Sequence, residues 1–297
     1  MIDSKRKWRR DRPHLVSFGD SRLRKSTRRF RRQALLLREF ATIRIKDQTE
    51  LNRDFVVRNF EQLKPTVRGF GYWMWKPQVV LERLSELPEN SILFYADVGF
   101  HINPRGKKRF RAWITQFEKS SEWLLVFQAT PPEIFPAHDG RRLPSLEDAF
   151  WCKGDLVDFM GMRDHPELWT PTIGAGLFAV KNTQSARSFL LEWLRFAEQH
   201  FGLIDDTESA APNTDGFREH RHDQSFFSLW VKRNSIGSRL SAYEYWYPNK
   251  NGRGADWRAL KWSPFLAKRD LGAQANVTSY YRTLRRRLSG LVRDFRG

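Results

Sequence analysis

Cysteine and long apolar runs are the two features that this sequence most clearly lacks. Cys152 is the only cysteine among the 297 residues, which excludes an intrachain disulfide framework and fits a reducing compartment. No stretch approaches the roughly 20 apolar residues of a membrane-spanning helix. The N-terminus is a basic run without the apolar segment of a secretory signal. We therefore expect a cytoplasmic protein, and we interpret Cys152 as a buried apolar thiol rather than a nucleophile.

Acidic residues are also scarce, with 34 Asp and Glu against 52 Lys and Arg, and the formal net charge is +18. The excess lies at the two ends of the chain. Residues 1–33 carry +10 and residues 282–297 carry +5, so the 248 residues between them hold only +3. A nearly neutral body with two cationic ends predicts that the ends, and not the whole surface, contact a polyanionic partner.

The last residues follow a basic amphipathic pattern. Leu284, Leu288, Leu291 and Phe295 are spaced by 4, 3 and 4, which makes a helical apolar stripe among arginines. Such a helix is typical of an element on an anionic membrane surface, where each basic residue adds about 1 kcal/mol to the free energy of binding. The alternatives are a terminal helix docked on the body, or nucleic acid as the polyanion. Against nucleic acid, the sequence contains no helix-turn-helix, zinc-finger or ribonucleoprotein motif.

Strands and helices alternate through most of the chain. The expected helices cover residues 22–40, 51–63, 78–87, 106–119, 184–201 and 223–234, and the expected strands cover 14–20, 41–46, 91–99, 123–128 and 172–180. This order predicts an α/β domain with a largely parallel sheet, in which ligands bind at the carboxyl ends of strands.

The domain organisation follows from these patterns. We expect a basic leader at 1–12, a single domain at 13–270 and a basic amphipathic helix at 271–297. The polar stretch 205–222 is expected to be a loop that could act as a mobile lid.

One motif whose side chains could take part in binding or catalysis is Tyr95-Ala-Asp-Val-Gly-Phe-His101, which ends the apolar run that starts at Ser91. A single acid at the end of a buried strand stands where an α/β sheet presents groups to a ligand. Asp97 is therefore a candidate binding residue. The alternative is an Asp that only caps a turn.

A second motif is His220-Arg-His-Asp-Gln-Ser225, which directly precedes an apolar helical run. Asp223 is expected to be the N-cap of that helix, and a carboxylate is favoured at a helix N-terminus in any case. The functional interpretation is that Asp223 and Gln224 project into a site. His220 and His222 could ligate a metal, since imidazole suits several metals.

A third motif is Arg68-Gly-Phe-Gly-Tyr-Trp-Met-Trp-Lys-Pro77. Its glycines allow a flexible backbone, its aromatic side chains offer flat surfaces, and Arg68 and Lys76 are cations beside them. This mixture could cradle a nucleotide and its phosphates. It could equally be aromatic core beside a helix that starts near Pro77.

These motifs together resemble nucleotide-sugar glycosyltransferases of the GT-A fold. The resemblance covers roughly residues 65–235. It is carried by four segments in the family order, namely Gly-Tyr-Trp-Met-Trp-Lys-Pro, Ile-Leu-Phe-Tyr-Ala-Asp-Val-Gly, Gly-Ala-Gly-Leu-Phe and His-Asp-Gln-Ser. It is strongest to bacterial enzymes of polysaccharide and lipopolysaccharide assembly, and more distant to glycogenin-like enzymes. The resemblance implies a Rossmann-like, mostly parallel mixed sheet flanked by helices, with basic N- and C-terminal extensions.

The resemblance also implies roles for the strand-end motif. Asp97 matches the first acid of an Asp-x-Asp motif, which lies near the donor ribose and a Mn²⁺ or Mg²⁺ ion in such enzymes. Gly99 stands where the second acid would be, so metal binding is in question. His101 would substitute if the strand continues in register past Gly99.

Further roles follow for the other segments. Gly174, Ala175 and Gly176 match a small-residue strand that lets the donor sugar approach the backbone, and Asp223 with Gln224 matches a pair that lines the donor-sugar pocket and reaches the reacting carbon. The diphosphate leaving group needs a cation, either a divalent ion or Arg and Lys. Arg68 and Lys76 are therefore candidates for this cation, and Trp75, which offers a flat ring beside them, is a further expected donor-binding residue.

The sequence thus predicts a glycosyltransferase that moves a sugar from a nucleotide-diphosphate donor to a glycan or glycolipid acceptor. The basic ends would hold it on the inner face of the cytoplasmic membrane. One alternative is a non-enzymatic protein that binds nucleic acid through its cationic ends. Another is a degenerate relative that binds donor without transfer, which Gly99 keeps open. Asp223 could act as the base of an inverting enzyme and Gln224 as the polar group of a retaining one, so the stereochemistry stays undecided.

Overall fold

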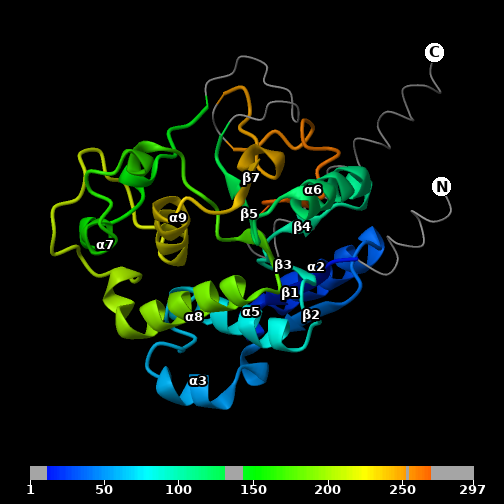
Figure 1. Cartoon of the computed structure of the whole chain (residues 1–297), viewed down its shortest axis with the longest axis horizontal. Helices are drawn as coiled ribbons and strands as arrows, with labels where there is room; N and C mark the ends of the chain where they lie inside the picture. The colour runs from blue at the N-terminus through cyan, green and yellow to red at the C-terminus, as the bar shows by residue number, and fades with distance from the viewer. Residues whose placement is uncertain (1–11, 131–142, 252–253, 269–297) are drawn as a thin grey trace, which may run out of the picture.

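The computed structural model describes residues 12–130, 143–251 and 254–268 (Figure 1). The predicted amphipathic helix at 271–297 and all but the last residue of the predicted leader lie outside this range. Within it, no helix is both long enough and apolar enough to cross a bilayer.

A six-stranded sheet forms the centre of the protein, in the order β2-β1-β3-β6-β5-β7. The strands are β1 (His14–Phe18), β2 (Ile43–Lys46), β3 (Ile92–Ala96), β5 (Leu124–Gln128), β6 (Leu177–Lys181) and β7 (Ser238–Ser241). Five of them run in one direction, and only β6 runs antiparallel to its neighbours β3 and β5. The predicted α/β class with a mostly parallel sheet is confirmed.

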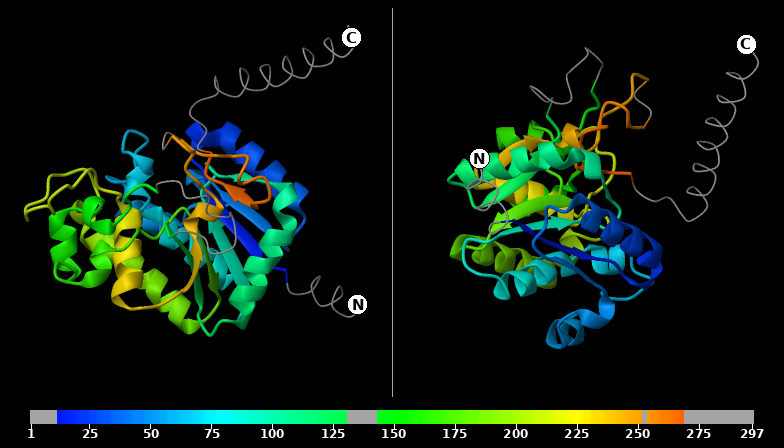
Figure 2. Two further views of the ribbon diagram at one scale, coloured as in Figure 1. Left: turned by 90° about the horizontal axis from the view of Figure 1, so that it is seen from above. Right: turned by 90° about the vertical axis from the view of Figure 1, so that its right-hand side faces the viewer.

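Helices cover both faces of the sheet (Figures 1 and 2). The central strand β3 is buried along its whole length, so its side chains alternate between two apolar clusters. Leu93 and Tyr95 pack with the helices α5, α8 and α9, whereas Ile92, Phe94 and Ala96 pack with α2 and α6. The longer helices are α2 (Arg24–Leu37), α5 (Trp75–Ser85), α6 (Lys107–Lys119), α8 (Gln184–Gln199) and α9 (Asp223–Arg233).

The expected helices are present, but two were predicted too long. The segment at 51–63 is helical only in α3 (Arg53–Arg58), which Asn52 begins by accepting a hydrogen bond from the backbone N–H of Phe55. The helix expected at 22–40 is α2, which ends where Arg38 adopts a left-handed conformation.

The strand predicted at 172–180 is β6, which begins five residues later than expected. Before it, Ile173 forms only an isolated bridge to Gln128. Short elements were not predicted from the sequence. These are α4 (Gly69–Tyr72), α7 (Gly154–Phe159), β7, and the two-residue strands β4 (His101–Ile102) and β8 (Phe265–Leu266), which pair with each other.

Candidate functional site

Three segments that are distant in sequence meet beyond the carboxyl end of β3. Lys76 on α5 donates hydrogen bonds to Asp223 Oδ2 and, at 3.2 Å, to the carbonyl oxygen of Ala175. Its ammonium nitrogen is also 3.8 Å from Asp97 Oδ1. The structure therefore brings together Lys76, Asp97, Ala175 and Asp223, four residues singled out from the sequence.

Asp97 lies at the open side of this cluster, with its side chain 35% exposed. The Tyr95 hydroxyl donates to Asp97 Oδ1 at 2.6 Å, and the backbone N–H of Asp97 donates to the carbonyl of Gly176 at 2.9 Å. Burial, followed by the nearby Asp97 charge, raises the pKa of Tyr95 well above its usual value. Tyr95 therefore remains a donor that orients Asp97, a role that the sequence analysis missed.

Gly176, just before β6, leaves room for this carboxylate. A Cβ at Gly176 would be 2.9 Å from Asp97 Oδ2, and one at Gly174 would be 2.5 Å from the hydroxyl of Tyr245. Glycine at 176 is thus a steric requirement of the position of Asp97. The small-residue segment and the strand-end acid form one structural unit.

Asp223 is the first residue of α9 and not its N-cap. His222 occupies the cap position with φ 55° and ψ −126°, and the Asp223 carboxylate accepts a hydrogen bond from Lys76. Burial raises the pKa of Asp223 to about 6, and the Lys76 charge opposes this rise. Gln224, the next residue, is half-buried, and its side-chain amide makes no hydrogen bond with any residue that the structure describes.

The raised pKa of Asp223 predicts a pH dependence of stability. An unfolded Asp loses its proton near pH 3.9, so between about pH 4 and 6 the native chain holds more protons than the unfolded chain. Raising the pH through this window therefore lowers the free energy of unfolding. We therefore expect the Tm of the wild type minus the Tm of Asp223→Asn to fall between pH 4.5 and pH 7.

Asp158 supplies the opposite control for this measurement. A hydrogen bond from Arg163 lowers the pKa of that exposed carboxyl. The difference in Tm between the wild type and Asp158→Asn should therefore grow as the pH rises. A wild-type advantage over Asp223→Asn that grows with pH would contradict the effect of burial at Asp223.

The aromatic segment before Lys76 has an unusual backbone. Gly69, Phe70, Gly71, Tyr72 and Trp73 all have positive φ between 48° and 89°. Each non-glycine residue in such a left-handed turn costs about 1–2 kcal/mol, so packing must hold the turn in place.

Trp75 lies in the core of the protein. Its ring packs on Phe18 with centroids 4.1 Å apart, its indole N–H donates to the Gly69 carbonyl, and only 4% of the residue is exposed. This placement matches the aromatic-core alternative, and a contact from Trp75 to the donor stays a prediction.

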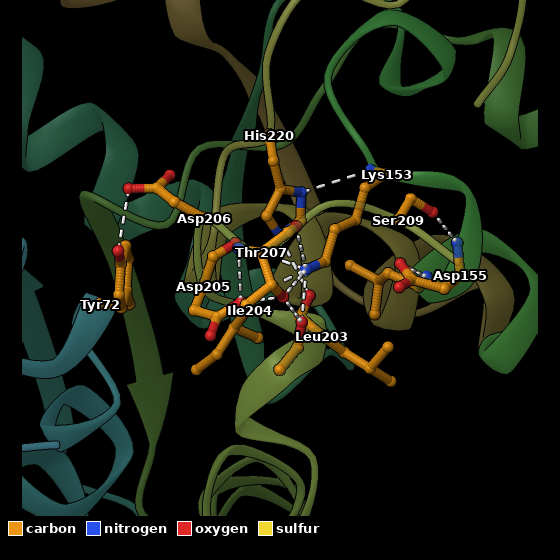
Figure 3. A network of polar contacts seen from close by, with 12 residues as sticks. Tyr72, Lys153, Asp155, Leu203, Ile204, Asp205, Asp206, Thr207, Ser209 and His220 are labelled. Carbon is orange, nitrogen blue, oxygen red and sulfur yellow. Dashed lines mark hydrogen bonds and ion pairs between the residues drawn. The ribbon is translucent and has the colours of Figure 1, made fainter. Parts of the chain in front are cut away.

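Arg68 lies at the rim of the cluster and does not join Lys76. Its guanidinium is 3.4 Å from Asp206 Oδ1 and about half exposed. The Tyr72 hydroxyl donates to Asp206 Oδ2 at 2.9 Å (Figure 3). The ring of His222 lies 4.9 Å from the Tyr72 ring. This rim joins the aromatic segment to the loop that precedes α9.

The loop proposed as a lid is held by hydrogen bonds near both of its ends (Figure 3). The buried ammonium of Lys153 donates to the carbonyls of Gly202 and Thr207, and its backbone N–H donates to His220 Nδ1. His220 Nε2 donates to the Leu203 carbonyl, and burial lowers the pKa of His220 to about 3. Lys153 was missed from the sequence because only the fold shows what it contacts.

The two histidines before Asp223 each donate a hydrogen bond to a backbone carbonyl. His222 Nδ1 donates to the Ile204 carbonyl at 2.9 Å. His101 lies in β4, since the chain turns at Asp97–Phe100 and does not continue β3 in register. The condition on which His101 would replace the second acid is therefore not met.

A divalent ion bound at Asp97 would have the Lys76 ammonium as a neighbour. Mg²⁺ is often held by one or two carboxylates and substrate phosphates, but here the Lys76 ammonium lies 3.8 Å from Asp97 Oδ1 and repels a cation. Among the described residues, no group of three or more His, Cys, Asp or Glu side chains could hold a metal. No step below depends on a metal, and the Mn²⁺ or Mg²⁺ requirement stays a prediction.

No protein-family model and no curated protein matches the sequence. Several solved structures similar to the chain are glycosyltransferases of the GT-A fold. Mouse xyloside xylosyltransferase 1 is 12% identical over 78% of this chain and 86% of that one, with a TM-score of 0.40. A glycosyltransferase involved in glycosylation of the major capsid of PBCV-1 is 11% identical over 88% and 94%, with a TM-score of 0.43. The galactosyltransferase LgtC, solved with donor and acceptor sugar analogs, is 12% identical over 78% and 74%, with a TM-score of 0.38. At these values the likeness supports no residue assignment, and the site rests on its own geometry.

Proposed function

We propose that the chain is a glycosyltransferase that uses a nucleotide-diphosphate sugar as donor and a hydroxyl of a glycan or glycolipid as acceptor. The observation that carries the proposal is the cluster of Lys76, Asp97 and Asp223 beside Gly176. It combines two carboxylates, a buried cation and a close backbone approach at the carboxyl end of a strand in an α/β sheet. The carboxyl ends of strands are where such sheets bind ligands.

Asp97 is the proposed donor-binding residue. Its Oδ1 accepts from Tyr95, while Oδ2 lies over the space that Gly176 leaves empty. A carboxylate fixed in this way accepts hydrogen bonds from the hydroxyls of a ribose or a sugar. The backbone at Gly174–Gly176 then forms one wall of the donor site.

Asp223 and Gln224 are the proposed residues at the reacting sugar. Glycosyl transfer has an oxocarbenium-like transition state, and a fixed carboxylate stabilises the positive charge that develops there. Lys76 carries one positive charge against the two carboxylates, so the cluster keeps a net negative charge. Lys76 is 2% exposed and bound to protein oxygens, so we assign it to positioning the carboxylates. A direct contact from Lys76 to phosphate stays a prediction.

The half-exposed Arg68 is the proposed cation for the diphosphate leaving group. Its present partner, Asp206, is also about half exposed, so a phosphate can compete for the guanidinium. We further propose that the acceptor is a polysaccharide, a lipopolysaccharide or a lipid-linked glycan. We also propose that the protein acts on the inner face of the cytoplasmic membrane.

Thermal unfolding with UDP-, GDP-, CMP- and dTDP-sugars, with and without Mn²⁺ or Mg²⁺, tests this proposal. A donor at 100 times its Kd raises the free energy of unfolding by about 2.7 kcal/mol, which is a shift of several degrees. We expect one nucleotide family to give this shift. No shift with any donor, metal present, would favour nucleic-acid binding. A shift without transfer to any acceptor would favour a degenerate donor-binding relative.

Two glycines provide a matched pair of variants for the same assay. Gly176→Ala places a Cβ 2.9 Å from Asp97 Oδ2 and should abolish the donor-induced shift, whereas a Cβ at Gly99 meets nothing within 4 Å. Gly99→Ala should therefore keep the shift. An equal response of the two variants would remove Asp97 from the donor site.

A further inference from the structure

Helix α2 has an exposed face that is both basic and apolar. We call Lys25, Arg28, Arg31, Arg32, Leu35 and Leu36 the α2 outer face, since all six are exposed while Phe30, Ala34 and Leu37 point into the core. Residues 21–38 contain no Asp or Glu. None of the four basic side chains forms an ion pair with any residue in the described ranges.

This arrangement opposes the stability of the helix. Like charges three and four residues apart repel one another, and Arg28, Arg31 and Arg32 have this spacing with no acid between them. Leu35 and Leu36 are 59% and 51% exposed. A partner that supplies negative charge and accepts apolar side chains would relieve both features at once.

The described chain begins and ends beside this helix. Arg12 donates to the carbonyl of Arg38 at the end of α2, and the backbone N–H of Ile102 in β4 donates to Gln33 of α2. β4 pairs with β8, the last strand before Lys268. Residues 1–11 and 269–297 carry net charges of +3 and +5, so the sequence beyond both ends has the same sign as the α2 outer face.

The inner side of α2 contacts the candidate site. Arg29 donates to the carbonyls of Val98 and Phe100 at 2.7 Å each, in the turn that follows Asp97. Figure 1 places α2 on the side of the molecule away from α7 and α9. A surface that contacts α2 therefore lies next to the Asp97 turn.

We propose that the α2 outer face docks the protein on an anionic lipid membrane. The exposed leucines favour a bilayer over a nucleic acid, because they insert among acyl chains but match nothing on a phosphate backbone. The proposal rests on the membrane location proposed above, for which it names the docking surface, and its tests do not depend on the reaction that the chain catalyses.

The first test measures binding of the full chain to vesicles of phosphatidylcholine alone and of phosphatidylcholine with phosphatidylglycerol. Each basic residue near an anionic surface contributes about fivefold to binding. Arg28→Gln/Arg31→Gln/Arg32→Gln should therefore weaken binding to the anionic vesicles by at least about tenfold. The matched control Arg53→Gln/Arg195→Gln/Arg233→Gln removes the same charge from exposed positions on α3, α8 and α9 and should change binding by less than about threefold.

The second test uses the leucines and does not need the charge variants to fold. Leu36→Cys, labelled with an environment-sensitive dye, should shift to the blue on anionic vesicles, whereas labelled Val57→Cys on α3 should not. Cys152 is fully buried and stays unlabelled. Equal losses in the two arginine variants, no dye shift at position 36, or tighter binding to duplex DNA than to the anionic vesicles would each overturn the proposal.

Discussion

Asp223→Asn is expected to lower kcat/KM for sugar transfer by about 10²-fold or more while the protein stays folded. Asparagine keeps the shape of the side chain and an oxygen that accepts the Lys76 hydrogen bond. It lacks the negative charge that stabilises an oxocarbenium-like transition state. Asp97→Asn should cause a loss of similar size, seen mainly in KM for the donor, because Asp97 is proposed to hold the donor and not the reacting carbon.

The activity assay needs a carboxylate control far from the cluster. Asp158 on α7 is exposed and paired with Arg163, so Asp158→Asn should keep activity within about twofold of the wild type. Full activity in both folded site variants would refute the site assignment. A loss in Asp158→Asn as large as in Asp223→Asn would show a general effect of lost charge.

Lys76→Met is expected to lower the free energy of unfolding by about 3–5 kcal/mol, because it leaves two carboxylates near each other without their cation. Asp223 is 5% exposed, so water reaches it poorly. Removing both partners of a buried pair is often nearly neutral. The double variant Lys76→Met/Asp223→Leu should therefore recover most of the stability that Lys76→Met loses.

Urea unfolding of the wild type, Lys76→Met, Asp223→Leu and the double variant gives the coupling energy between the two side chains. The exposed Lys108 on α6 is the matched control, and Lys108→Met should change the free energy of unfolding by less than about 0.5 kcal/mol. A double variant that is less stable than Lys76→Met would show that the stability lost in Lys76→Met does not come from an unpaired Asp223 carboxylate.

The central strands and longer helices were predictable because their patterns are local. Apolar runs at 91–99 and 123–128 and amphipathic spacing at 184–201 each reflect burial of one element. The direction of β6 was not predictable, because a strand buried on both faces has the same pattern whether it runs parallel or antiparallel. The two-residue strands β4 and β8 depend entirely on pairing with each other.

The candidate site shows the same division. Asp97, Lys76, Ala175 and Asp223 stood out as acids, a cation and small residues at the ends of predicted elements, and they meet in the structure. Trp75 was placed in the site because flat rings beside cations fit both ligand stacking and a core. Tyr95 and Lys153 were missed because their contacts join distant segments that sequence spacing does not relate.

The contacts of Lys76 have a consequence for the order of folding. They join residues separated by 99 and 147 positions along the chain. Closing loops of this length costs conformational entropy, and contacts between distant residues form slowly. The cluster therefore exists only after α9 has docked against α5 and the β6 segment. A ligand that binds there recognises a chain in which α9 has docked, and no fragment that ends before Asp223, so recovery of binding during refolding reports this long-range step.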